Sequence, residues 1–191
     1  QVNDEIMAFV SFDVVTNVVT VKRGCFDTVP QKHSAGSKIF GWDNYSGIDD
    51  LEYLSGEVVS LKALTLTGSD LLELNVATTH SMTLSNRAIR PYPPANVKIN
   101  GEYWPSFIED HLALTWAHRN RLQQTGGEVL SWFNEDVTSE TGVTYKVKIF
   151  DDETDLTIHE VSEITANNVV IDAQFCKLIF HQHFHVKLML L

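Results

Sequence analysis

The sequence is poor in basic residues and has no long apolar run, and each shortage excludes a class of protein. Its 14 lysines and arginines against 25 aspartates and glutamates give a formal net charge of −11. The chain therefore lacks the basic surface by which proteins hold nucleic acid. No apolar run reaches the roughly 20 residues of a membrane-spanning helix, and the most apolar stretch, 175–191, is interrupted by histidines and a lysine. We expect neither a nucleic-acid partner nor a membrane span.

Strand-forming residues, in contrast, are abundant. Hydrophobic residues make up 43% of the 191 positions and charged residues 20%, which is enough apolar material for an ordinary core. Gly, Asn, Asp and Ser interrupt the apolar segments at intervals of about 8–12 residues, a spacing typical of short antiparallel strands. The composition predicts an all-β protein.

The first half of the chain predicts a small, barrel-like β domain over residues 1–86. Residues 5–12 and 18–22 alternate as strands do, and residues 13–17 between them supply the turn of a hairpin. Further strands are expected at 37–42, 57–66 and 81–84. For residues 70–77 the pattern leaves a strand and a short helical turn equally open.

A proline-rich connector is predicted at 87–96. Three of the four residues 91–94 are prolines, which remove backbone donors and favour an extended path. This segment marks the domain boundary, so Cys25 and Cys176, the only cysteines, fall in different domains. We expect both to be reduced and to serve as small hydrophobic residues.

After the connector, residues 97–191 contain several short alternating segments. Leu112, Leu114 and Trp116 share one side of the segment 111–118, as in a strand with one buried face. Further strands are expected at 97–99, 144–150, 156–161, 169–172 and 180–190. This pattern, with one buried Trp near its start, predicts a fibronectin type III- or immunoglobulin-like sandwich. No clear closing strand follows, so we expect the sandwich to be incomplete.

Three segments resemble parts of the tail proteins of siphophages and prophages. Residues 114–121 (LTWAHRNR) and 141–150 (TGVTYKVKIF) resemble the fibronectin type III-like domain of those proteins. Residues 87–96 (RAIRPYPPAN) resemble the connector before that domain, and residues 23–33 (RGCFDTVPQKH) resemble the small β domain that precedes the connector. The segments occur in the family's order, and the resemblance covers nearly the whole chain.

The resemblance implies a structural and assembly module without enzymatic activity. Its place would be the virion tail, at the tail tip or baseplate, after synthesis in the bacterial cytoplasm of a lysogen. Its partners would be other tail proteins or copies of itself. Proteins of this family are often linked to host attachment, so a host surface glycan or protein is a further possible partner.

Aromatic residues in or beside the loop 41–56 support an alternative, a receptor- or carbohydrate-binding module. Trp42, Tyr45 and Tyr53 are the candidate ligand- or partner-binding residues, because aromatic rings on loops can stack on sugars or on a partner protein. The competing interpretation is that these rings fill the core or the seam between the domains.

A run of alternating histidines is the strongest indication of a metal site in the sequence. In a strand, His181, His183 and His185 would share one face, and imidazole is a favoured zinc ligand. The solvent face of a half-buried strand explains the same placement, so we assign no metal site. The acidic residues around Gly47 lack the spacing of a calcium loop.

The sequence contains no recognisable catalytic motif. Its serines lie in ordinary strand or loop contexts, and no Gly-rich phosphate loop, Cys-x-x-Cys or His-Glu-x-x-His occurs. A pair of carboxylates for glycoside hydrolysis stays open, because their separation is a property of the tertiary structure. We expect no enzymatic activity and no cofactor, with a cell-envelope hydrolase as the third alternative.

Overall fold

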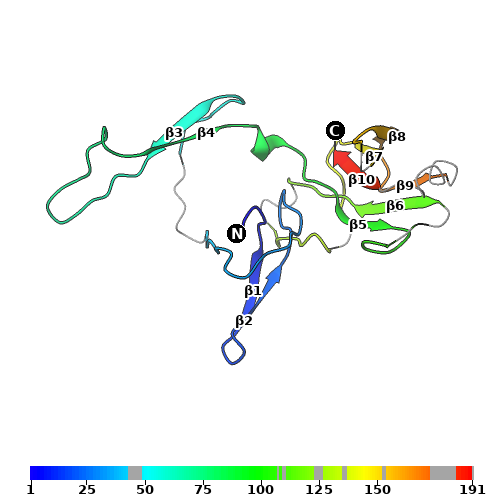
Figure 1. Ribbon diagram of the computed structural model, residues 1–191, viewed down its shortest axis with the longest axis horizontal. Coiled ribbons are helices and arrows are strands. Elements are labelled where there is room, and N and C mark those ends of the chain that lie inside the picture. The colour runs from blue at the N-terminus through cyan, green and yellow to red at the C-terminus, as the bar shows by residue number, and fades with distance from the viewer. Residues whose placement is uncertain are drawn as a thin grey trace. The chain divides into compact units, whose positions relative to one another are not determined.

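The computed structural model describes residues 1–42, 49–106, 108, 111–122, 127–134, 137–151 and 154–172, and the backbone of 184–190. Its strands are β1 (Ala8–Asp13), β2 (Val18–Lys22), β3 (Val58–Lys62), β4 (Thr79–Thr83), β5 (Ala95–Ile99), β6 (Leu112–Ala117), β7 (Tyr145–Asp151), β8 (Thr157–Ile164), β9 (Asn168–Ile171) and β10 (Phe184–Leu190) (Figure 1). One 3₁₀ turn, η1, covers Arg87–Ile89. The prediction of an all-β protein is confirmed.

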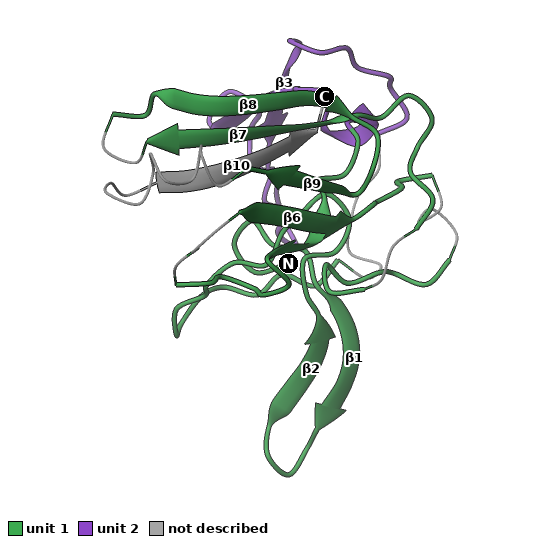
Figure 2. Ribbon diagram, turned by 90° about the vertical axis from the view of Figure 1, so that its right-hand side faces the viewer, with its two compact units in different colours: residues 1–43, 91–191 green, residues 44–90 purple. Residues whose placement is uncertain are grey.

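The strands form four antiparallel sheets in two compact units. Unit 1 comprises residues 1–43 and 91–191, and unit 2 comprises residues 44–90 (Figure 2). Unit 1 contains the hairpin β1-β2 and two three-stranded sheets, ordered β5-β6-β9 and β10-β7-β8. Unit 2 contains the two-stranded sheet β3-β4.

The main core of unit 1 lies between the two three-stranded sheets. Every second side chain of β7 is buried, and Leu112, Leu114 and Trp116 of β6 are buried against them in the same apolar cluster. The prediction that these three residues face inward together is confirmed. The rings of Trp116 and Tyr145 lie 5.1 Å apart at the centre of this cluster.

The expectation of a barrel-like N-terminal domain is wrong. In the described part of residues 1–86, β1-β2 and β3-β4 form separate two-stranded sheets, and neither closes on itself. The expected strand at 37–42 is reduced to a single bridge between Val2 and Ile39. The described residues between β2 and β3 are mostly turns and extended segments outside any ladder, and no described strand joins the two sheets into one.

The division of the chain also differs from the expected domains 1–86 and 97–191. Residues 1–43 belong to the same unit as 91–191, because Lys22 at the end of β2 and Arg23 after it bond to the segment 127–132. The amide of Trp132 donates to the carbonyl of Arg23 at 2.8 Å, and Lys22 Nζ donates to the carbonyl of Val129 at 3.0 Å. Within the expected connector 87–96, the first residues form η1 and the last two belong to β5.

Candidate partner-binding surface

The hairpin β1-β2 closes at the turn that its sequence predicts. Asp13 Oδ1 accepts hydrogen bonds from the amides of Val15 and Thr16, at 2.8 and 3.3 Å. Asn17 adopts a left-handed conformation with φ of +56°, which Asn tolerates better than most residues. The predicted hairpin is therefore confirmed, with the Asp13 side chain bonded to the turn and Asn17 reversing the backbone at its other end.

A β-bulge gives this hairpin one apolar face. The register pairs Phe9 with Val21 and Phe12 with Val19, and it shifts between Phe9 and Ser11. In a regular strand Phe9 and Phe12 would point to opposite faces, because side chains alternate with a period of two. The extra residue at the bulge reverses that alternation, so both rings lie on the face of Val19 and Val21.

This hairpin face, defined by Phe9, Phe12, Val19 and Val21, is largely uncovered. The side chains of Phe9 and Phe12 are 68% and 49% exposed, and Val15 at the tip is 85% exposed. The hairpin projects away from the two three-stranded sheets of unit 1 (Figure 2). An apolar patch on a projecting element of this kind is a typical mark of a protein-interaction site.

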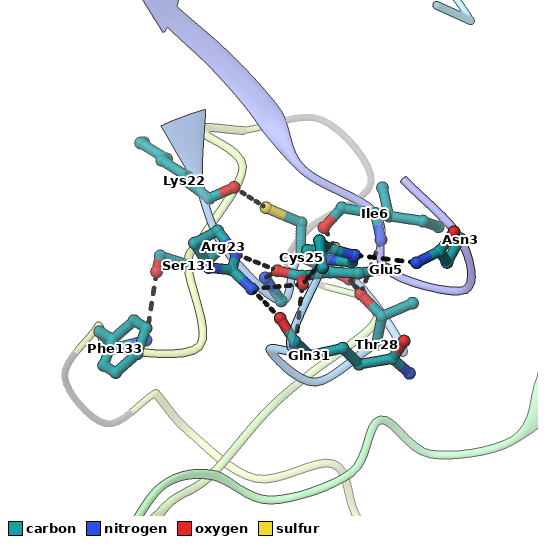
Figure 3. Close-up of polar contacts among 12 residues, drawn as sticks. Asn3, Glu5, Ile6, Lys22, Arg23, Cys25, Thr28, Gln31, Ser131 and Phe133 are labelled. Atoms are coloured by element: carbon teal, nitrogen blue, oxygen red, sulfur yellow. Dashed lines mark hydrogen bonds and ion pairs between the residues drawn. The ribbon is translucent and has the colours of Figure 1, made fainter. Parts of the chain in front are cut away.

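A buried carboxylate anchors the base of the hairpin. Glu5, whose side chain is fully buried, precedes β1, and Arg23 follows β2. Arg23 donates to both oxygens of Glu5, from Nε at 2.6 Å and from Nη2 at 2.7 Å. Figure 3 shows Arg23 and Gln31 gathered round Glu5. The bidentate ion pair thus joins the two ends of the hairpin.

Three further donors complete the coordination of Glu5. The amides of Gly24 and Gln31 each donate at 2.9 Å, and His33 Nε2 donates at 2.7 Å. Burial works to raise the pKa of Glu5, but the hydrogen bonds from Arg23, Gln31, His33 and Gly24 outweigh it and lower the pKa to about 2. Glu5 is therefore an ionised structural centre at neutral pH.

The residues after Arg23 wrap tightly beneath this centre. Gly24 has φ of +57°, and a Cβ atom there would lie 2.6 Å from Pro30 Cδ and 2.8 Å from Trp132 Cβ. Cys25 is fully buried, and burial raises the pKa of its thiol. Its amide donates to the carbonyl of Ile6 at 2.9 Å. The position of Gly24 thus requires glycine both for its conformation and for its space.

Arg119, just after β6, ties this segment to the end of that strand. Its side chain is buried, its Nη2 donates to the carbonyl of Phe26 at 2.9 Å, and its guanidinium lies 5.8 Å from the centre of the Tyr92 ring. Burial lowers the pKa of Arg119. The charged side chains of Glu5, Arg23 and Arg119 therefore fix the segment that joins the hairpin to the rest of unit 1.

The aromatic candidates of the sequence are not among the residues that define this face. Trp42 is 55% exposed, and its indole N–H donates to Gln1 Oε1 at 3.2 Å. The hydroxyl of half-buried Tyr53 donates to Asp49 Oδ2, which lowers the pKa of Asp49 and raises that of Tyr53. Tyr45 lies outside the described residues. Trp42 belongs to unit 1 and Tyr53 to unit 2.

The histidine candidates fall where side chains are not described. His181 and His183 lie outside the described residues, and His185 is placed only as backbone of β10, opposite Phe150 of β7. Within the part of the chain that the structure describes, no three His, Cys, Asp or Glu side chains gather as a metal site. The described residues also include no helix with the length and apolarity to span a bilayer.

A pocket of about 550 Å³ opens at the turn between β5 and β6. Glu102 and His111 are among its lining residues. The side chain of Asn100, also in the lining, is engaged within the turn, donating to the carbonyl of His111 at 3.0 Å and accepting from the amide of Ala113 at 2.8 Å. We assign no chemistry to this pocket.

Sequence reasoning missed the residues that build the surface and its anchor. Glu5 reads as the first residue of a strand, and the bulge at Val10 leaves no mark in the pattern. A signal did exist for the anchor, since Arg23, Gly24 and His33 lie in the segment 23–33, one of those on which the resemblance to tail proteins depends.

We compared the chain with family models and with curated proteins, and neither comparison found a match.

Proposed function

We propose that this protein is a structural and assembly module of a phage or prophage tail, acting at the tail tip or baseplate without enzymatic activity. The observation that carries an assembly role is the hairpin face, an uncovered apolar surface on a rigidly anchored, projecting hairpin. Such a surface binds by burying apolar area against a partner protein. Its partner in this proposal is another tail protein.

The assignment to a tail rests on the family resemblance, and the fold is compatible with it. The strand orders β5-β6-β9 and β10-β7-β8, with Trp116 in the core between the sheets, support a fibronectin type III-like sandwich over residues 95–190. The motif segments 114–121 and 141–150 overlap β6 and β7, the central strands of the two three-stranded sheets.

The role in the virion is tested by asking whether the chain is part of the particle. We expect mass spectrometry of purified particles, from a host that carries this gene, to detect the chain, and labelled antibody against it to mark the tail in electron micrographs. Particles that lack the chain, or label on the capsid alone, would contradict the proposal.

The role of the hairpin face is tested by replacing both rings. We expect the double variant Phe9→Ser, Phe12→Ser to keep the melting temperature of the wild type and to enter particles at least tenfold less. Val18→Ser is the matched control, because Val18 is an exposed apolar residue of the same hairpin that pairs with Asp13 on the opposite face. Equal incorporation of the double variant and the control would refute the docking role.

A carbohydrate- or receptor-binding function is the second candidate. The exposure of Trp42 favours it, since an exposed indole offers a flat apolar surface for a sugar ring. A glycan array probed with the wild type, Trp42→Ala and Tyr45→Ala separates the two candidates. Binding that is lost in either variant would favour attachment over a purely structural role, and absence of binding in the wild type would remove this candidate.

A further inference from the structure

Three aromatic rings gather beside β5 in unit 1. The ring centres of Tyr103 and Trp132 lie 6.1 Å apart, and Phe133 lies 5.9 Å from the first and 5.0 Å from the second. Trp132 is buried, and it packs against one alanine of β5 and one of β6. Its carbonyl accepts from the amide of Asn96 in β5 at 2.9 Å. The ring cluster, defined as Tyr103, Trp132 and Phe133, is therefore fixed to the core through Trp132.

Two rings of this cluster, and the indole next to it in the chain, reach solvent. Tyr103 is 39% exposed, Phe133 is 51% exposed and Trp104 is 85% exposed. The contacts with buried Trp132 hold Tyr103 and Phe133 in place while part of each ring stays uncovered. A ring that is already fixed loses little conformational freedom when a ligand stacks on it. The cluster is therefore a preformed aromatic surface.

Trp104 has an unusual backbone conformation. Its φ is +57°, in the left-handed region that a bulky side chain rarely adopts. It also precedes Pro105, and a proline favours an extended conformation for the residue before it. The exposed indole gains little contact within the chain that would offset this strain. Strained residues of this kind concentrate at ligand-binding sites, so the display of Trp104 itself points to a ligand.

Polar groups with uncommitted donors lie among these rings. Lys98 Nζ lies 5.0 Å from the centre of the Tyr103 ring, and it makes no hydrogen bond or ion pair in the described part of the chain. The Tyr103 hydroxyl donates to Asn96 Oδ1, and the Nδ2 group of Asn96 donates to no described residue. The hairpin face, in contrast, consists of Phe and Val side chains alone. The ring cluster thus combines flat apolar surface with free hydrogen-bond donors.

We propose that the ring cluster, together with Lys98 and Trp104, binds a saccharide. A pyranose ring has an apolar face of C–H groups and a rim of hydroxyls, so its binding needs an exposed aromatic ring and hydrogen-bond donors side by side. Lys98 Nζ and Asn96 Nδ2 would donate to those hydroxyls. Trp104, next along the chain, would offer a second flat surface for an adjoining sugar unit.

The chemistry of the site favours a saccharide over an apolar protein surface. Docking a purely apolar partner here would remove water from the Lys98 ammonium and the Asn96 amide without supplying acceptors, which is costly. Sugar hydroxyls supply those acceptors. The inference goes beyond the proposed structural role, and it assigns saccharide binding to residues other than the loop aromatics Trp42, Tyr45 and Tyr53.

A glycan array, followed by calorimetric titration with each saccharide that binds, tests the proposal on the full chain. We expect the wild type to bind, and Phe133→Ala and Trp104→Ala each to raise the dissociation constant at least tenfold. Trp42→Ala is the matched control, because Trp42 is also an exposed indole of unit 1 but lies outside the ring cluster; we expect its affinity to be unchanged. Melting temperatures check that the fold is kept, and highly exposed Trp104 provides the test if Phe133→Ala unfolds.

Lys98→Met separates a saccharide from an apolar protein partner. It keeps the aliphatic stem and removes the donor, so we expect saccharide binding to weaken at least tenfold, whereas docking of an apolar surface would be kept or strengthened.

A wild type that binds no saccharide would overturn the proposal, and reduced entry of Trp104→Ala into particles would then assign the cluster to a protein partner. Binding that Trp42→Ala abolishes and Trp104→Ala and Phe133→Ala leave unchanged would overturn it too, because the site would lie elsewhere. Neither result bears on the hairpin face, whose variants lie in β1. Failure of this inference and failure of the proposed function are therefore distinguishable.

Discussion

Replacing Glu5 by Gln tests whether the buried carboxylate holds the hairpin to unit 1. Glu5 Oε1 accepts from Arg23 Nε and the amide of Gly24, and Oε2 accepts from Arg23 Nη2, the amide of Gln31 and His33 Nε2. Gln has the same shape, but one of its two terminal atoms is an NH₂ group. That group would face two or three donors, and the charge of Arg23 would lose its partner.

The pKa of Glu5 sets the size of the effect. Lowering that pKa from 4.5 to about 2 on folding corresponds to about 3 kcal/mol of stability at neutral pH, at roughly 1.36 kcal/mol per pKa unit. Removing one partner of a buried ion pair typically costs about 3–5 kcal/mol. Since the side chain of Arg23 is 34% exposed and can regain water, we expect a loss near the lower value, about 3 kcal/mol.

The pH dependence has a definite sign. The folded pKa lies below the unfolded one, so the contribution of Glu5 is complete above about pH 4.5 and is lost as the pH falls toward about 2. We expect the difference in unfolding free energy between the wild type and Glu5→Gln to be largest at pH 7 and to shrink steadily below pH 4.5.

Urea denaturation, followed by the fluorescence of buried Trp116 and Trp132, measures this difference at a series of pH values. Glu128→Gln is the control, because Glu128 is an exposed carboxylate that pairs with Lys22 beside the same hairpin; we expect it to change little. A Glu5→Gln variant as stable as the control at pH 7, or with an unchanged deficit at pH 3, would refute the anchoring role.

Three further substitutions probe the interior of unit 1, each measured as the change in unfolding free energy. Gly24→Ala should cost about 2–4 kcal/mol, because its Cβ would collide with Pro30 and Trp132 at a left-handed φ. Trp116→Ala should cost about 3–5 kcal/mol through the cavity it leaves. Tyr145→Phe should cost about 1–2 kcal/mol, because the hydroxyl contacts His118 Nδ1 at 2.7 Å. Wild-type stability in any one of them would contradict the corresponding contact.

Local pattern was enough to predict most of the strands. The expected segment 18–22 coincides with β2, 111–118 contains β6, and 144–150 overlaps nearly all of β7. Buried side chains alternate strictly along β7 and along β6 as far as Trp116, so the period of two is visible in the chain itself. The expected strand 37–42 was wrong, because its apolar residues Ile39 and Phe40 remain exposed and find no ladder partner beyond one bridge.

The candidate surface was only partly predictable. The turn at 13–17 follows from Asp13 and Asn17, whose side chains act on the backbone beside them. The bulge that brings Phe9 and Phe12 to one face depends on how β1 pairs with β2, and pairing is a property of two strands together. Trp42, Tyr45 and Tyr53 were predicted as binding residues because they are aromatic and lie on or beside a loop. That criterion takes no account of how strands pair.

The sequence by itself determined the all-β class, the hairpin turn and the inward face of β6, because each depends on residues within a few positions of one another. The tertiary structure alone decided which charges are buried and which segments share a unit. Glu5 meets Gln31 and His33 from 26 and 28 positions away, and Arg119 reaches Phe26 across 93. Contacts over such distances depend on the path of the whole chain, and no local periodicity records that path.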